Sequence, residues 1–76
     1  MSPVRKRSVT IRGHRTSFSL EDAFHHELER IAVRRGMPLA ALVAEVDAAR
    51  DRATNLSSAL RLFVLEQLRG VPTTAS

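Results

Sequence analysis

Apolar and polar side chains alternate along residues 9–20, and the alternation then stops. Its polar positions near the end are Arg15, Ser17 and Ser19. A period of two is typical of a strand that buries one face and exposes the other. The pattern therefore predicts one short strand over residues 9–19.

After Leu20 the large apolar residues recur every three or four positions, which is the spacing of an amphipathic helix. Three such patterns follow one another, and Gly36 with Pro38 separates the first two because these residue types break helices. A short polar segment precedes the third pattern, and Asn55 within it is a suitable N-cap. We therefore predict helices over residues 20–35, 39–52 and 56–69.

Ser19 is also a candidate N-cap for the first helix. Asp22 follows it three residues later, in a pattern close to a capping box. The same side chain lies on the polar side of the predicted strand, and a side chain that caps a helix is not free to point outward from a strand. Of the two roles we favour the cap.

The third predicted helix has more apolar surface than one buried face needs. Its apolar residues occupy most of its sides: Leu56, Leu60, Leu62, Phe63, Val64, Leu65 and Leu68. A helix of this kind is usually covered by other protein. A second chain or a central position within a monomer would provide the cover, and we favour the second chain.

A single strand leaves backbone N–H and C=O groups unpaired along both edges. The strand can fold on itself at Gly13-His14, pairing Val9–Ile11 with Thr16–Phe18, or it can pair with the same strand of a second chain. We favour pairing between two chains. A chain of 76 residues without cysteine has no disulfide to support a small core, and such domains often rely on a partner.

Positive charge is concentrated near the N-terminus of this chain, whose net charge is +4. The first twenty residues carry five basic side chains and no acidic one, whereas all eight acidic residues lie from Glu21 onward. Most of the basic residues are arginines, which suit bidentate contacts with phosphate and guanine. Residues 1–8 are therefore expected to form a basic flexible arm, which either binds a polyanion such as nucleic acid or only aids solubility.

The succession of these elements resembles the ribbon-helix-helix DNA-binding domains, the Arc- and MetJ-type bacterial repressors. The resemblance rests on the strand alternation, the apolar positions from Leu20 to Ala32, Gly36, and a second helix that opens with residues 37–40. The additional helical pattern, with the sequence NLSSAL at residues 55–60, is similar to a longer variant of these domains.

The resemblance implies a mostly α-helical fold with one short strand and a third helix. Two chains would intertwine as a homodimer, and their strands would form an intermolecular two-stranded antiparallel β-ribbon. The domain would span residues 9–70, followed by a flexible tail over residues 71–76. The implied dimer core is apolar: Phe18, Leu20, Phe24, Leu28, Leu42, Val43, Val46, Leu60, Phe63 and Val64.

In the family, the ribbon enters the major groove of double-stranded DNA and alternate strand residues contact base edges. The resemblance thus implies base contacts by Arg15, Ser17 and Ser19. Phosphate contacts would come from basic side chains and from the first N–H groups of the second helix. These phosphate candidates are Arg5, Lys6, Arg7, Arg12, Leu39 and Ala40.

We therefore expect a small bacterial transcriptional regulator in the cytoplasm, with double-stranded DNA and a second copy of the chain as its partners. The alternative is a protein-interaction module, antitoxin-like or adaptor-like, that uses the apolar third helix. No metal is expected, because the adjacent His25 and His26 lack the four-residue spacing that puts two ligands on one helix face. No catalytic motif, signal peptide or membrane span is recognised, so we expect no enzyme, no cofactor and no membrane partner.

Overall fold

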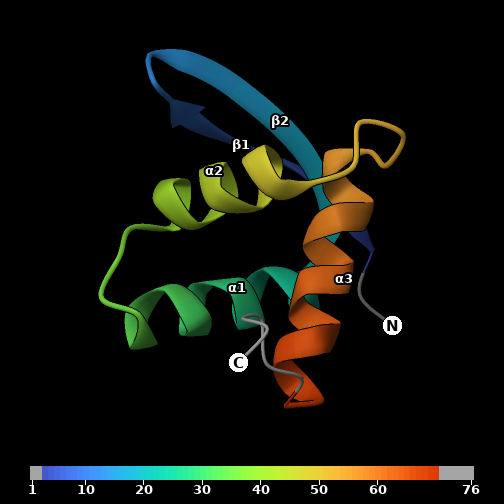
Figure 1. Cartoon of the computed structure of the whole chain (residues 1–76). Coiled ribbons are helices and arrows are strands. Elements are labelled where there is room, and N and C mark those ends of the chain that lie inside the picture. The colour runs from blue at the N-terminus through green and yellow to red at the C-terminus, as the bar shows by residue number, and fades with distance from the viewer. Residues whose placement is uncertain (1–2, 71–76) are drawn as a thin grey trace.

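The computed structural model describes residues 3–70 and begins with a β-hairpin (Figure 1). Strand β1 (Val4–Ile11) and strand β2 (His14–Glu21) are antiparallel. All 8 residues of β1 have a partner on β2. The predicted strand therefore finds its partner within its own chain, as in the alternative that the sequence analysis did not favour.

Three expectations about this region are wrong. The sheet has two strands rather than one, residues 4–8 belong to β1 rather than to an arm, and the turn lies at Arg12-Gly13 rather than Gly13-His14. Both turn residues have positive φ, 52° for Arg12 and 81° for Gly13, as a type I′ turn requires. Arginine is uncommon at positive φ, so the sequence carries no strong signal for this turn.

Three helices follow the hairpin, as predicted: α1 (Asp22–Arg34), α2 (Leu39–Ala49) and α3 (Leu56–Leu68). Asn55 caps α3 as expected, because its side-chain oxygen accepts a hydrogen bond from the Ser58 N–H at 2.9 Å. None of the helices within the described part of the chain is both long and apolar enough to cross a membrane.

Strand β2 runs directly into α1. The N-cap of α1 is Glu21, whose backbone is extended and whose side chain makes no capping hydrogen bond. Ser19 lies within β2, two residues before that cap. The capping role favoured for Ser19 is therefore wrong, and its side chain belongs to the strand.

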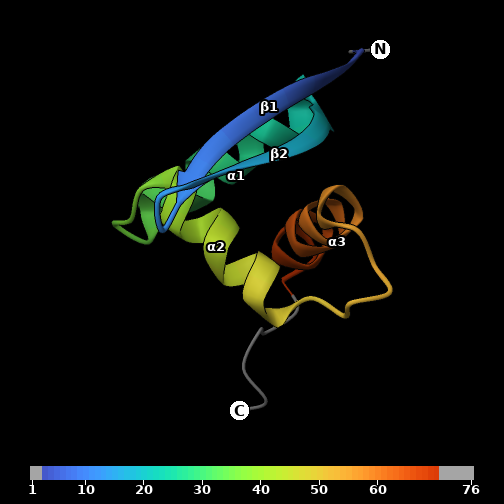
Figure 2. The same ribbon diagram turned by 90° about the horizontal axis from the view of Figure 1, so that it is seen from above.

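The hairpin lies over a layer of three helices that contact one another (Figures 1 and 2). Strand β1 packs against α2, while β2 packs against α1 and α3. Apolar side chains from β2 and from all three helices meet between the hairpin and the helices. The buried ones are Phe18, Leu20, Leu28, Ile31, Ala32, Leu42, Val43, Val46, Leu56, Leu60 and Val64.

The residues assigned to a dimer core from the sequence pack together within one chain. Leu20, Leu42 and Leu60 have no exposed surface. Phe24 and Phe63 are partly buried and pack at the margin of the same cluster. These residues therefore form one hydrophobic cluster within the chain.

Candidate nucleic-acid interface

The outer face of the hairpin, turned away from the helices, is made of polar side chains from both strands. Successive residues of a strand point to opposite faces, and residues opposite each other in an antiparallel pair share a face. Three cross-strand pairs therefore lie side by side on the outer face: Lys6 with Ser19, Ser8 with Ser17, and Thr10 with Arg15. We call these six residues the outer face below.

Only half of this outer face was predicted from the sequence. Base contacts were expected for Arg15, Ser17 and Ser19 of β2, and the structure brings these three together. Lys6 was expected in an arm, and no role was expected for Ser8 or Thr10. Their alternation with apolar Val9 and Ile11, which pack against the core, was a signal that a second strand begins earlier.

The outer face and the hairpin turn carry three basic side chains, Lys6, Arg12 and Arg15. Among the described residues, Lys6, Arg12 and Arg15 form no ion pair, because all the recorded ion pairs are made by other basic side chains. By the same alternation, Val4 and Glu21 form the next pair on this side, and the Glu21 carboxylate is paired with Arg61. Such unpaired cations on one surface favour binding of a polyanion.

Arg15 lies across the hairpin rather than straight out from it. Its Nε donates a hydrogen bond to Ser8 Oγ at 3.2 Å. A shallow hollow between the strands is lined by Lys6, Ser8, Arg15 and Ser17, together with Arg7. Within residues 3–70, no hydrogen bond or ion pair is recorded for the two terminal amino groups of Arg15.

Arg5 and Arg7 point to the other face of the hairpin. Both contact the Asp22 carboxylate in the first turn of α1, Arg5 through Nε at 3.3 Å and Arg7 through Nη2. Arg7 Nη2 also donates to the Leu20 carbonyl at 3.5 Å. Two of the expected phosphate contacts thus attach β1 to the start of α1.

The start of α2 presents backbone donors near the hairpin turn. The Pro38 carbonyl accepts hydrogen bonds from the N–H groups of Ala41 and Leu42, at 3.1 and 3.2 Å. The N–H groups of Leu39 and Ala40 have no recorded acceptor within residues 3–70. Both views place this helix start on the same side of the molecule as the hairpin turn (Figures 1 and 2).

The start of α3 lies against the edge of β2 that faces away from β1. Ser57 Oγ accepts a hydrogen bond from the Ser19 N–H at 2.9 Å, and Arg61 Nη2 donates to the Ser19 carbonyl at 3.3 Å. Arg61 Nε also donates to Glu21 Oε1 at 3.1 Å. A hydrogen bond from its own backbone N–H lowers the pKa of the Glu21 carboxyl, and the bond from Arg61 lowers it further.

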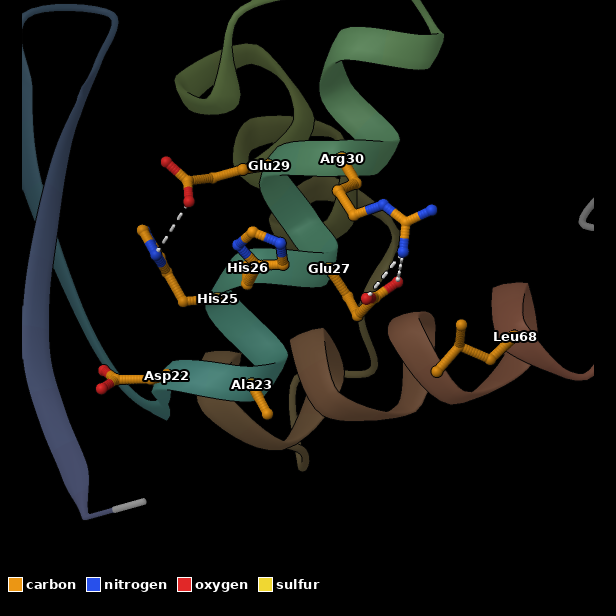
Figure 3. Close-up of a pocket in the computed structure, with 8 residues that line it drawn as sticks. All are labelled: Asp22, Ala23, His25, His26, Glu27, Glu29, Arg30 and Leu68. Atoms are coloured by element: carbon orange, nitrogen blue, oxygen red, sulfur yellow. Dashed lines mark hydrogen bonds and ion pairs between the residues drawn. The ribbon is translucent and has the colours of Figure 1, made fainter. Parts of the chain in front are cut away.

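A separate hollow is lined by residues of α1 and by Leu68 of α3 (Figure 3). His25 points toward Glu29, with 3.5 Å between Nδ1 and Oε1, whereas His26 points elsewhere. Burial lowers the pKa of His25, and the positive charge of Arg7 lowers it further. Within the described residues, no three potential ligands gather as they would around a metal ion, and the mixed charges of this hollow indicate no particular ligand.

One comparison with known proteins identifies a relationship. The family model described as "Ribbon-helix-helix domain" matches residues 4–68, a span that begins with β1 and ends with α3. Both the additional strand and the additional helix therefore lie within the matched region. No curated protein and no solved structure matched the chain.

Proposed function

Because the chain belongs to the ribbon-helix-helix domain family, we propose that it is a small bacterial transcriptional regulator that binds double-stranded DNA sequence-specifically. The observation that carries this proposal is the outer face of the hairpin, where two basic and four hydroxyl side chains lie side by side on two paired strands. The major groove of B-DNA admits a two-stranded ribbon. The structure supplies a ribbon whose exposed surface is chemically suited to that groove.

Within this proposal, Arg15 is the main base-reading residue. Arginine donates two hydrogen bonds to O6 and N7 of guanine, the commonest specific contact in protein–DNA complexes. Ser17 lies beside it on the outer face and offers a short donor and acceptor. Ser19 has a smaller role, because it is half-buried beside α3.

Phosphate contacts would come from both sides of the hairpin. In the part of the chain that the structure describes, Lys6 and Arg12 have no carboxylate partner, and the N–H groups of Leu39 and Ala40, which have no recorded acceptor there, lie at the positive end of α2. The Arg5 side chain is 62% exposed and can still turn toward a phosphate. The Arg7 side chain is only 19% exposed, and Asp22 holds it against α1.

The proposal is tested by selecting bound duplexes from a random DNA library and measuring affinity as a function of salt. We expect one enriched sequence motif, and a log–log salt dependence that corresponds to several displaced counterions. Absence of any binding to duplex DNA at low salt would contradict the proposal.

We also propose that the protein is a homodimer, and that the second copy uses the exposed side of α3. Leu62, Leu65 and Leu68 are 53%, 44% and 63% exposed. The ribbon-helix-helix family implies dimerisation, and the hairpin does not itself require a second strand. The same surface would serve the alternative role as a protein-interaction module. Light scattering of the wild type and of Leu65→Lys tests this proposal, since only the wild type should be dimeric.

A further inference from the structure

We infer that Asp22, in the first turn of α1, is a positioning residue for DNA binding: its carboxylate holds Arg5 and Arg7 of β1 away from the DNA backbone, which limits binding to duplexes of any sequence. This inference rests on the proposed DNA-binding function. Phosphate contacts supply affinity without sequence information, so keeping cations away from phosphates raises the ratio of specific to non-specific binding. Three observations support the inference.

The first observation is that the hairpin divides the basic side chains of β1 between its two faces. Arg5 is opposite Leu20, which is buried. Arg7 is opposite Phe18, which is also buried. Because residues opposite each other share a face, Arg5 and Arg7 lie on the inner face, whereas Lys6 between them lies on the outer face. Three consecutive cations in the sequence therefore do not form one continuous surface for phosphates.

The second observation is that one carboxylate contacts both arginines of the inner face. Arg5 Nε lies 3.3 Å from Asp22 Oδ1, and Arg7 Nη2 contacts the same oxygen. A negative charge at Asp22 is also favourable for α1, because this residue lies at the positive end of the helix. The carboxylate therefore partly cancels two positive charges that would otherwise attract phosphate.

The third observation is that Arg7 has few other contacts to hold it. Apart from those with Asp22, its only recorded side-chain hydrogen bond within residues 3–70 goes to the Leu20 carbonyl at 3.5 Å. Its Nε is buried and has no recorded partner there. A partly buried guanidinium that loses its carboxylate is stabilised by turning toward solvent or toward another anion. Loss of the charge of Asp22 should therefore release Arg7, together with the more exposed Arg5.

Released arginines should favour non-specific complexes more than the specific one. In the specific complex, base contacts fix the position of the outer face on the duplex. On any other sequence the protein can shift along the duplex until an additional arginine meets a phosphate. The charge of Asp22 therefore sets how strongly the protein prefers its own sequence.

The first test measures the affinity of the full chain and of Asp22→Asn for the selected duplex and for a duplex of unrelated sequence, over a range of salt. We expect Asp22→Asn to bind the unrelated duplex roughly five- to tenfold more tightly at about 0.1 M salt, with a salt-dependence slope steeper by about 0.9 for each released arginine. The preference for the selected duplex should fall. Glu27→Gln is the matched control, because it also removes one negative charge from α1 but at a side chain paired with Arg30.

Equal changes in Asp22→Asn and Glu27→Gln would show an effect of net charge alone, and the inference would then be wrong. The same holds if Asp22→Asn keeps the salt-dependence slope and the sequence preference of the wild type. A wild-type chain that binds neither duplex would instead overturn the proposed function itself.

The second test uses the wild-type chain and so does not depend on the stability of a variant. The NMR signals of the arginine Nε–H groups are followed while the unrelated duplex is added. We expect the signals of Arg12 and Arg15 to shift and that of Arg7 to stay in place, because Asp22 holds its guanidinium. An Arg7 signal that shifts as much as that of Arg12 would mean that Arg7 reaches a phosphate in the presence of Asp22, which contradicts the inference.

Discussion

The hydroxyl of Ser57, in the first turn of α3, accepts a hydrogen bond from the backbone N–H of Ser19 in β2 at 2.9 Å. A side chain of a helix here accepts the backbone hydrogen bond that a neighbouring strand would accept elsewhere in a sheet. Arg61, one turn later in α3, donates a hydrogen bond to the carbonyl of the same residue, Ser19. The third helix is therefore part of the sheet's hydrogen bonding as well as part of the core.

Ser57→Ala should lower the free energy of unfolding. The substitution leaves the Ser19 N–H facing α3 without an acceptor, and an unsatisfied, partly buried donor costs about 1–3 kcal/mol. Urea unfolding of the variant against Ser58→Ala measures this cost. Equal stability of the two variants would show that water replaces the Ser57 hydroxyl.

Arg15→Ala should weaken binding to the selected duplex by about 1–3 kcal/mol and relax the preference at one base pair. Fluorescence anisotropy with the selected duplex and with its single-base variants measures both effects. Arg34→Ala is the control, because Arg34 is exposed, lies at the end of α1 and forms no recorded ion pair within residues 3–70. If both variants lose the same affinity and base preference, Arg15 does not read a base.

Arg12→Asn should have opposite effects on stability and on DNA binding. Asparagine tolerates positive φ and is favoured before glycine in type I′ turns, so unfolding should cost about 0.5–1 kcal/mol more. Loss of the charge should reduce the salt-dependence slope by about 0.9 if Arg12 contacts one phosphate. Lys6→Gln is the control, since it removes a charge without changing the turn. If the variant is more stable but the salt-dependence slope is unchanged, Arg12 occupies the turn as described and does not contact a phosphate.

His25 should make the folded state less stable at acid pH. Its pKa is lowered in the folded state, mainly by burial and secondly by Arg7, from an ordinary value of 6.5. The unfolded chain therefore binds a proton more readily, so stability is fully present above about pH 6.5 and is lost as the pH falls toward the folded-state pKa. His25→Gln should lose less stability between pH 8 and pH 5, as measured by urea unfolding. The neighbouring Glu29 and Asp22 oppose the shift, so an equal loss in both proteins would mean that their charges cancel the effect of burial.

The helices were predictable because their signals are local. Gly36 with Pro38 marks one boundary and Asn55 marks the next, and each acts through backbone geometry within a few residues. Predicted and observed helix ends differ by at most three residues, since the last turn of a helix depends on its contacts as well as on its sequence.

The hairpin was only the less favoured alternative in the sequence, because its turn and its first strand lack the usual residue types. Arg12 occupies a position where asparagine or glycine is expected, and the run from Arg5 to Arg7 hides the alternation of β1. Arg5 and Arg7 lie on the inner face because Asp22 provides a partner there. That carboxylate is fifteen residues from Arg7, so no short sequence window contains both.

The contact of α3 with β2 could not be predicted from the sequence at all. Ser57 and Ser19 are 38 residues apart, and a serine at a helix start is most simply interpreted as part of a cap. Only the three-dimensional arrangement shows that its hydroxyl serves the strand. The outer face was more predictable than this contact, because three of its six residues follow from the alternation in β2 alone.

The distance in sequence between Ser19 and Ser57 also sets the order of events during synthesis. The hairpin is made of neighbouring residues and can close early, whereas Ser57 and Arg61, which bond the far edge of β2 at Ser19, are synthesised later. Until then the nascent chain carries an open edge beside other growing chains. Emergence of α3 covers this edge at Ser19, and so leaves less of β2 open to pairing with strands of other chains during synthesis.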